Sequence, residues 1–282
     1  PTEFLGYEFE NAEGIVLKIL KNNNFVETAK SGDEVEIITN QTPFYGESGG
    51  QVGDQGLIQT TSCKINIKDT QKKVSDLFVH IGKIEKGSIK VGESVNLSIN
   101  TIRRNNSKAY HSATHLLHES LRRTLGKHVT QKGSLVSPER LRFDFSHNKP
   151  IEKDEMTKIN KIVNDFVIGC SEVQTRIMTP KEAVGMGALA LFGEKYGEEV
   201  RVVFMGKENN GFFSTELCGG THVKNTKEIG EFKVVSQSSI ASGVRRVEAL
   251  RDEQLKIFEK SLNEEKTNKD KKISNEIINI QD

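Results

Sequence analysis

The sequence predicts an α+β chain: a small N-terminal antiparallel β-barrel, then a mixed α+β domain, then a C-terminal linker helix. Three observations support this class. Short β-branched segments separated by Gly and Asp dominate the first hundred residues. Helical and strand patterns alternate after residue 101, and the chain becomes mostly polar with a helical period after residue 252. We therefore expect three parts with boundaries at 1–100, 101–251 and 252–282.

Six segments of the first part have the alternation and the β-branched residues typical of strands. They are residues 14–20, 34–39, 57–60, 64–68, 77–81 and 94–99. Between them lies the glycine-rich segment 42–56 (TPFYGESGGQVGDQG), which we interpret as a loop with special backbone conformations. We expect the barrel to pack on the second part without supplying residues to its functional site.

The second part opens with the clearest helical pattern of the chain, residues 107–125, whose apolar side chains repeat at helical spacing and which Gly126 ends. A second helix is predicted over 151–169, and a short one starts at Pro180. Predicted strands cover 128–136, 140–146, 172–178, 200–206, 229–235 and 244–250. In the third part, Leu255, Phe258 and Leu262 lie on one helical face.

Composition restricts the class of protein. Of 282 residues, 35% are hydrophobic and 28% are charged, and the net charge is +1. No run approaches the roughly 20 apolar residues of a membrane-spanning helix, and no signal peptide is recognisable. Three cysteines without regular spacing fit a reducing compartment, so we expect a cytoplasmic protein. The chain begins with Pro1 and its first methionine is Met156, which we interpret as a segment of a longer protein.

Positive charge is concentrated in residues 101–142, where nine Lys or Arg stand against two Glu, a local net charge of +7. Such a cluster is typical of a surface that binds a phosphate backbone. Ordinary solvated charge on a helix and two strands explains it equally well. The nine are Arg103, Arg104, Lys108, Arg122, Arg123, Lys127, Lys132, Arg140 and Arg142.

Two pairs of residues have the spacing of metal ligands. His111 and His115 lie four apart on the predicted helix, which puts both imidazoles on one face. Cys218 and His222 are also four apart, separated by two glycines and a threonine that permit a tight turn. Either pair alone is more often surface or packing, but together they form a Cys/His₃ set suited to tetrahedral Zn²⁺. We interpret His118 as a packing residue or a contact of a ligand.

Four protein ligands are usual for a structural zinc, whereas a catalytic zinc keeps a position for water or substrate. A catalytic role would require a fifth ligand or the loss of one of the four. The spacing is compatible with both roles.

Long segments of the sequence resemble one family. Residues 111–147 and 214–250, which contain both ligand pairs, resemble the editing core of alanyl-tRNA synthetases. Residues 42–54 are similar to a signature of the small barrel that precedes that core, and residues 190–206 fit the same family. The resemblance covers most of residues 1–250. Residues 207–211 look like a short insertion that lengthens a hairpin.

The resemblance implies an editing hydrolase that cleaves the ester of seryl-tRNA(Ala) and glycyl-tRNA(Ala). Such a second site is needed because a pocket for alanine cannot exclude glycine and excludes serine only weakly. The implied partner is the 3′ end of the mischarged tRNA(Ala). The aminoacylation domain, which binds ATP and has the ligase activity, and any oligomerisation domain are expected to lie outside this chain.

The resemblance also implies the site residues. Zinc would be bound by His111, His115, Cys218 and His222, and a pocket glutamine is placed at Gln131, so that these five form the expected catalytic set. Further contacts are expected from the hydroxyls of Thr114 and Thr221, from Arg245 beside phosphate, and from Gly133, Gly219 and Gly220, where the terminal adenosine would approach the backbone.

Two other functions remain open at this point. A stand-alone deacylase acting in trans would share the same core, although the polar helix at 252–282 argues against it. A non-enzymatic tRNA-binding module would use the zinc structurally. Hydrolysis of mischarged tRNA by the chain, with and without a chelator, distinguishes the enzyme from the binding module.

Overall fold

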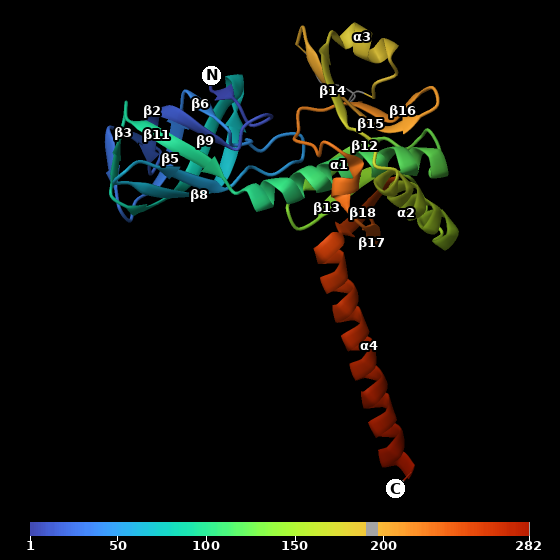
Figure 1. Ribbon diagram of the computed structural model, residues 1–282. Coiled ribbons are helices and arrows are strands. Elements are labelled where there is room, and N and C mark those ends of the chain that lie inside the picture. The colour runs from blue at the N-terminus through green and yellow to red at the C-terminus, as the bar shows by residue number, and fades with distance from the viewer. Residues whose placement is uncertain (190–196, 282) are drawn as a thin grey trace.

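The computed structural model describes residues 1–189 and 197–281 and has the predicted α+β architecture (Figure 1). A β-barrel stands at the N-terminal end, a mixed α+β body follows, and a long helix extends away from that body to the C-terminus. Residues 190–196, part of the 190–206 segment that resembles the synthetase family, lie outside the described residues.

The barrel closes through six antiparallel strands, because the last strand pairs with the first as well as with its other neighbour. In barrel order they are β2 (Asn11–Lys21), β5 (Glu34–Thr39), β9 (Leu77–Lys86), β8 (Lys64–Lys73), β7 (Gly56–Gln59) and β11 (Ser94–Ile99). All six were predicted, although β8 and β9 run further than their apolar alternation. Alternate residues point inward, so Ile19, Ile37, Ile65 and Leu97 are completely buried.

Five strands of two or three residues were not predicted, since such segments are too short to show alternation. They are β1 (Glu3–Phe4), β3 (Asn24–Val26), β4 (Thr28–Lys30), β6 (Gln41–Thr42) and β10 (Ser88–Lys90), accompanied by the 3₁₀ turn η1 (Val74–Asp76).

Helix α1 (Thr101–Leu125) connects the barrel to the mixed body. It begins six residues earlier than its apolar pattern predicted, because the Asn100 side chain caps it by accepting a hydrogen bond from the Arg103 amide at 3.1 Å. The helix ends where predicted: Gly126 has a φ of 127°, a conformation that favours glycine.

The described residues of the mixed body form two antiparallel sheets and further helices. One sheet has the order β12 (Gln131–Val136), β13 (Leu141–Ser146), β18 (Val244–Arg251), β17 (Phe232–Ala241). The other has the order β14 (Gln174–Met178), β15 (Val200–Glu208), β16 (Gly211–Leu217). The helices are α2 (Lys153–Ile168), α3 (Pro180–Gly185), the 3₁₀ turn η2 (Thr226–Ile229) and α4 (Asp252–Gln281).

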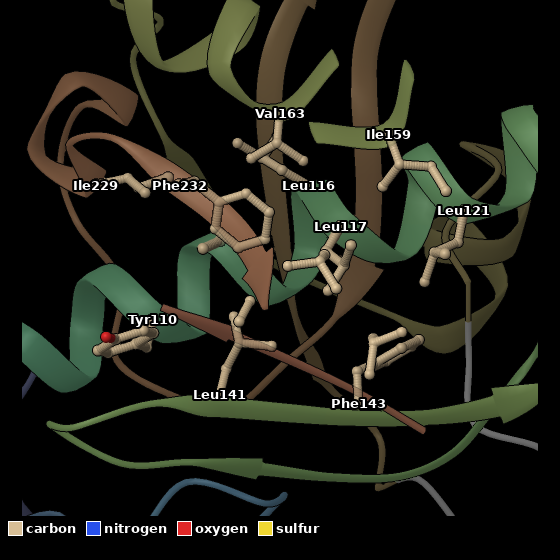
Figure 2. Close-up of a cluster of buried hydrophobic side chains, with 14 of the residues drawn as sticks. Tyr110, Leu116, Leu117, Leu121, Leu141, Phe143, Ile159, Val163, Ile229 and Phe232 are labelled. Atoms are coloured by element: carbon tan, nitrogen blue, oxygen red, sulfur yellow. The ribbon is translucent and has the colours of Figure 1, made fainter. Parts of the chain in front are cut away.

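The core of this body fixes α1 against α2 and the four-stranded sheet. Figure 2 shows Leu117 of α1, Val163 of α2 and Phe143 of β13 converging, and all three are completely buried. Burying one such side chain stabilises the fold by roughly 1.5–3 kcal/mol. The apolar face of α1 is therefore held inward, which fixes the direction of the histidines on the same helix.

Two local expectations had different outcomes. Residues 207–211 form the turn region of the β15–β16 hairpin, in which Glu208 pairs with Gly211, so an insertion at this place would lengthen a hairpin. The strand predicted at 229–235 begins only at Phe232, because Asn225 and Glu228 form a capping box that makes residues 226–229 helical.

The sequence predicted no membrane-spanning helix, and the described helices have the following character. None of them is both long and apolar enough to span a bilayer.

Candidate metal centre

The four side chains predicted to bind a metal lie together. His111 and His115 come from α1, and Cys218 and His222 lie in the loop that follows β16. One ligand atom from each lies within 4.8 Å of the others, and Cys218 Sγ is 3.4 Å from His111 Nε2 and 3.2 Å from His222 Nε2. Metal–ligand bonds of about 2.0–2.3 Å in a tetrahedron put ligand atoms about 3.3–3.8 Å apart. The group can therefore hold one metal ion after a small contraction.

The three imidazoles are oriented by hydrogen bonds to the ring nitrogen that faces away from the group. The partners of Nδ1 are Gln51 Oε1 for His111 (2.8 Å), Glu216 Oε2 for His115 (3.0 Å) and Ser112 Oγ for His222 (3.1 Å). The Nε2 atoms are left for a shared ligand, and Nε2 of His115 is buried with no hydrogen-bond partner among the described residues. Ligating histidines almost always have such a second contact. This unpartnered atom supports a metal at the centre.

The electrostatics favour the ligand forms of Cys218 and His222. Burial alone would raise the pKa of the Cys218 thiol, but the imidazoles of His111, His222 and His115 hold it well below its usual value. Burial lowers the pKa of His222 to about 3, which keeps this imidazole neutral. A thiolate and a neutral imidazole are the forms that bind a metal.

Glu216 stabilises positive charge on the opposite side of the group. Burial opposes protonation of His115, yet the Glu216 carboxylate and Cys218 outweigh it and raise the pKa of His115 to about 10. The two histidines His115 and His118 hold the pKa of Glu216 well below its usual value despite its burial. The carboxylate therefore favours a cation at His115, and in the metal-bound form that cation would be the metal itself.

His118 is a contact of this carboxylate and not part of the ligand group. Its Nδ1 is 3.0 Å from Glu216 Oε1, and its ring packs against Phe143 with centroids 5.1 Å apart. The Glu216 carboxylate thus contacts both His115 and His118, which lie about one turn apart on α1. His118 therefore packs against Phe143, one of the two expected roles, and reaches the ligand group only through Glu216.

The loop that carries Cys218 and His222 is fixed by two residues from other elements. The Arg201 guanidinium donates to the carbonyls of Cys218 (3.1 Å) and Gly220 (2.9 Å). The Tyr7 hydroxyl donates to the Gly219 carbonyl at 2.6 Å, and Arg201 lies over the Tyr7 ring at 4.1 Å. Each carbonyl from 218 to 220 thus has a donor, which holds the loop in one conformation.

Gly220 is required by the packing of a ligand. A Cβ at this position would lie 2.0 Å from His111 Cε1 and 2.3 Å from His111 Nδ1, whereas at Gly219 the nearest atom, Tyr7 Oη, would be 3.9 Å away. The imidazole of His111 thus fills the space beside Gly220. This intramolecular contact explains the glycine without the approach of a terminal adenosine.

We expect Gly220→Ala to displace His111 and to weaken zinc binding by more than about tenfold, the lower end of the effect of disturbing a ligand's immediate surroundings. Gly219→Ala is the matched control and should bind zinc as the unaltered chain does. Zinc affinity by competition with a chromogenic chelator measures both. Equal affinities for the two variants would contradict this account of the packing.

The other predicted site residues have the following contacts. Gln131, at the start of β12, donates to Ser134 Oγ at 3.1 Å, and Gly133 lies opposite Asp144 beside a bulge. The hydroxyl of Thr114 donates to the Tyr110 carbonyl in its own helix (2.8 Å), and Arg245 donates to Gln237 (2.9 Å). Thr221 alone among these bonds into the ligand network, through the side chain of Gln51.

The expectation that the barrel supplies no site residue is wrong. Gln51, in the glycine-rich loop, is completely buried and bonds to His111, and Tyr7 holds the ligand loop. Only the concentration of glycines in 42–56 indicated a special role in the sequence. Asp54, in the same glycine-rich segment, pairs with Arg104. The position of Glu216 could have been found in the sequence, because it precedes Cys218 by two residues and side chains two apart on a strand point to the same face.

The basic cluster of residues 101–142 is largely neutralised in the fold. Six of its nine cations form ion pairs with carboxylates: Arg103 with Glu139, Arg104 with Asp54, Arg122 with Glu119, Arg123 with Glu119 and Glu208, Arg140 with Glu248, and Arg142 with Asp144. Lys127 and Lys132 are exposed. The interpretation as ordinary surface and structural charge fits these pairs better than a free phosphate-binding surface.

Comparisons with known proteins show similarity to aminoacyl-tRNA synthetases. Residues 1–103 match a family described as tRNA synthetases class II (A), and residues 200–248 match the threonyl and alanyl tRNA synthetase second additional domain. The chain is 54% identical over 257 residues to the alanine–tRNA ligase of Mesorhizobium japonicum, covering 89% of this chain and 29% of that protein. The alanine–tRNA ligases of Chelativorans sp. and Sinorhizobium medicae are 55% and 51% identical, over 88% and 91% of this chain. The chain spans about three tenths of the length of these relatives, 29% and 30% in the last two.

Proposed function

We propose that this chain, which is homologous to a segment of the alanyl-tRNA synthetases, hydrolyses the ester of tRNA(Ala) mischarged with serine or glycine. The observation that carries the proposal is the Cys/His₃ group, with His111 and His115 buried and Cys218 and His222 half-buried, in which an outward hydrogen bond orients each imidazole. Two of its four residues lie in the segment that matches the second additional domain. The substrate would be the 3′ end of the mischarged tRNA. Three free cysteines fit the reducing cytoplasm, where such tRNA is used.

The need for such an activity follows from the size of the amino acids. A pocket that binds alanine cannot exclude glycine, and one added hydroxyl or missing methyl changes binding by only about 1–3 kcal/mol, roughly 10–200-fold. A second site that hydrolyses the wrong product supplies the remaining discrimination. A chain with its own rigid hydrolytic centre meets that need.

The residues of the group fit zinc by their chemistry, because Cys and His are its preferred ligands and their number is four. A bound zinc would polarise the ester carbonyl and orient the substrate. His111, His115, Cys218 and His222 would hold it, and Glu216 would keep His115 turned toward it. With four protein ligands, orientation and polarisation are favoured over a free zinc-bound hydroxide.

The remaining predicted residues would act around this centre. We propose that Gln131 hydrogen-bonds the serine hydroxyl or a water in the substrate-bound state, exchanging its contact with Ser134. Thr114, Thr221, Gly133 and Gly219 would border the amino acid and the terminal adenosine, with Gly220 giving its space to His111. Arg245 would face phosphate, and among the described residues its guanidinium has Gln237 as its only hydrogen-bond partner.

One observation favours a second candidate. A complete set of four protein ligands is the usual composition of a structural zinc site. In that case the chain would be a tRNA-binding module, and zinc would stabilise the junction of α1 with the 218–222 loop without taking part in hydrolysis.

The test is hydrolysis of seryl-tRNA(Ala) and alanyl-tRNA(Ala) by the purified chain, zinc-loaded or treated with a chelator. We expect the seryl ester to be cleaved faster than the alanyl ester, with loss of activity on chelation and recovery on zinc addition. Gln131→Ala should slow seryl-ester cleavage without lowering the melting temperature, while Lys132→Ala changes neither. A zinc-loaded chain that cleaves neither ester supports the binding module, and equal rates on both esters contradict discrimination by this chain.

A further inference from the structure

The glycine-rich loop of the barrel enters the metal centre. Its residues 50–52 lie along β12, where the Val136 amide donates to the Gly50 carbonyl (2.7 Å) and the Val52 amide donates to the Val136 carbonyl (3.0 Å). In Figure 1 the blue loops of the barrel point toward the second part of the chain. This pairing carries Gln51 into the space between α1 and the 218–222 loop, where its side chain is completely buried.

The Gln51 side chain forms three hydrogen bonds there. Its Oε1 accepts from the Thr221 amide at 3.0 Å and lies 2.8 Å from His111 Nδ1, and its Nε2 donates to Thr221 Oγ1 at 2.8 Å. One neutral side chain thus connects the helix that carries His111 and His115 to the loop that carries Cys218 and His222.

These contacts determine the tautomer of His111. The Thr221 backbone N–H can only donate, so the Gln51 atom that faces it is the amide oxygen. The same oxygen faces His111 Nδ1, which must therefore carry the proton as the donor. In the neutral imidazole, Nε2 of His111, which faces Cys218 Sγ, is then unprotonated and has its lone pair available.

We infer that Gln51 is a positioning residue of the metal centre: it holds His111 in the Nδ1–H tautomer and couples the barrel to both ligand pairs. The inference rests on the proposal that the four-residue group holds zinc, but not on ester hydrolysis. The physical reason is that the buried His111 Nδ1–H would otherwise lack an acceptor, and losing such a contact typically weakens metal binding 10–100-fold.

Three variants separate this role from simple docking of the loop. Gln51→Met keeps the volume of the side chain and removes the acceptor. Gln51→Glu retains an acceptor for His111 and for the Thr221 amide. Tyr45→Phe is the matched control, since it removes a hydrogen bond of the same loop, from the Tyr45 hydroxyl to the Ser48 carbonyl (3.0 Å), without touching His111.

The experiment measures the affinity of each variant for Zn²⁺ by chelator competition, with no tRNA present. We expect Gln51→Met to bind about 10–100-fold more weakly and Gln51→Glu to stay within about threefold of the unaltered chain. Tyr45→Phe should bind normally. Long-range ¹⁵N NMR of labelled histidine in the zinc form should show His111 protonated at Nδ1 in the unaltered chain, with an altered Nδ1–H resonance in Gln51→Met.

Several outcomes would overturn the inference. Normal zinc affinity in Gln51→Met, equal weakening in Gln51→Met and Tyr45→Phe, or no recovery in Gln51→Glu would each do so, as would a chain that binds no zinc. If Gln51→Met does not fold, Gln51→Glu and the NMR tautomer still decide. The expected order of affinities in a chain without esterase activity would support Gln51 while contradicting the proposed hydrolysis.

Discussion

Replacing Cys218 with alanine is expected to abolish zinc retention and, with it, hydrolysis of seryl-tRNA(Ala). Cys218 Sγ is within 3.4 Å of His111 Nε2 and 3.2 Å of His222 Nε2, so it lies at the centre of the ligand group. Its thiolate is also the only negative charge among the four ligands. Disturbing contacts one shell further out costs 10–100-fold in affinity, so losing this ligand should exceed about 100-fold.

Cys170→Ala is the matched control for this variant. Cys170 is exposed, and its thiol donates to the Ile168 carbonyl at 3.2 Å, with no hydrogen bond to the metal-ligand group among the described residues. Elemental analysis of freshly purified protein and the esterase assay compare the two variants. Full zinc content in Cys218→Ala would show that Cys218 is not a metal ligand. Loss of zinc with unchanged hydrolysis would instead make the metal structural.

Asp54→Ala should lower the free energy of unfolding by about 3–5 kcal/mol, the usual effect of breaking a buried ion pair. Arg104 is completely buried and Asp54 is 6% exposed. The guanidinium donates to Asp54 Oδ2, to the Gly6 carbonyl (2.7 Å) and to the Pro43 carbonyl (2.7 Å). Removing the carboxylate leaves a buried guanidinium without a counter-charge where α1 meets the barrel.

Urea denaturation with fitted midpoints and slopes measures this change. Glu34→Ala is the control, because Glu34 pairs with Lys68 at 3.1 Å in an exposed ion pair of the same barrel. Such surface pairs contribute about 0–1 kcal/mol, so Glu34→Ala should unfold near the unaltered midpoint. A loss below about 1 kcal/mol in Asp54→Ala would mean that the buried pair is not what joins the barrel to the helix.

The barrel and the main helices could be predicted from the sequence because each long element carries its own period. In β8, alternate residues of the predicted part point inward, and Ile65 and Ile67 are buried. Helix α1 places Leu117 and Leu121 on one buried face in the same way. The first turns of α1 had no such signal, because residues 101–106 are held by the Asn100 cap and by the buried pair of Arg104.

The sequence by itself identified the four side chains that could hold a metal ion. His111 and His115 are four residues apart on a helix and therefore lie on one face. The two glycines between Cys218 and His222 permit a tight turn, so local geometry alone brings the residues of each pair together. That the two pairs meet follows from the fold, but their identities and spacing were sufficient to predict a metal site.

Only the tertiary structure decided what surrounds these ligands. Gln51 is 60 residues from His111 in the sequence, and its side chain bonds to that imidazole. Glu216 is 98 residues from His118, and its carboxylate contacts the His118 ring. The charge count over residues 101–142 also missed carboxylates such as Glu208 and Glu248, which reach this segment from other strands. Such contacts leave no period in the chain, because they depend on how separate elements dock and not on the spacing of neighbours along one element.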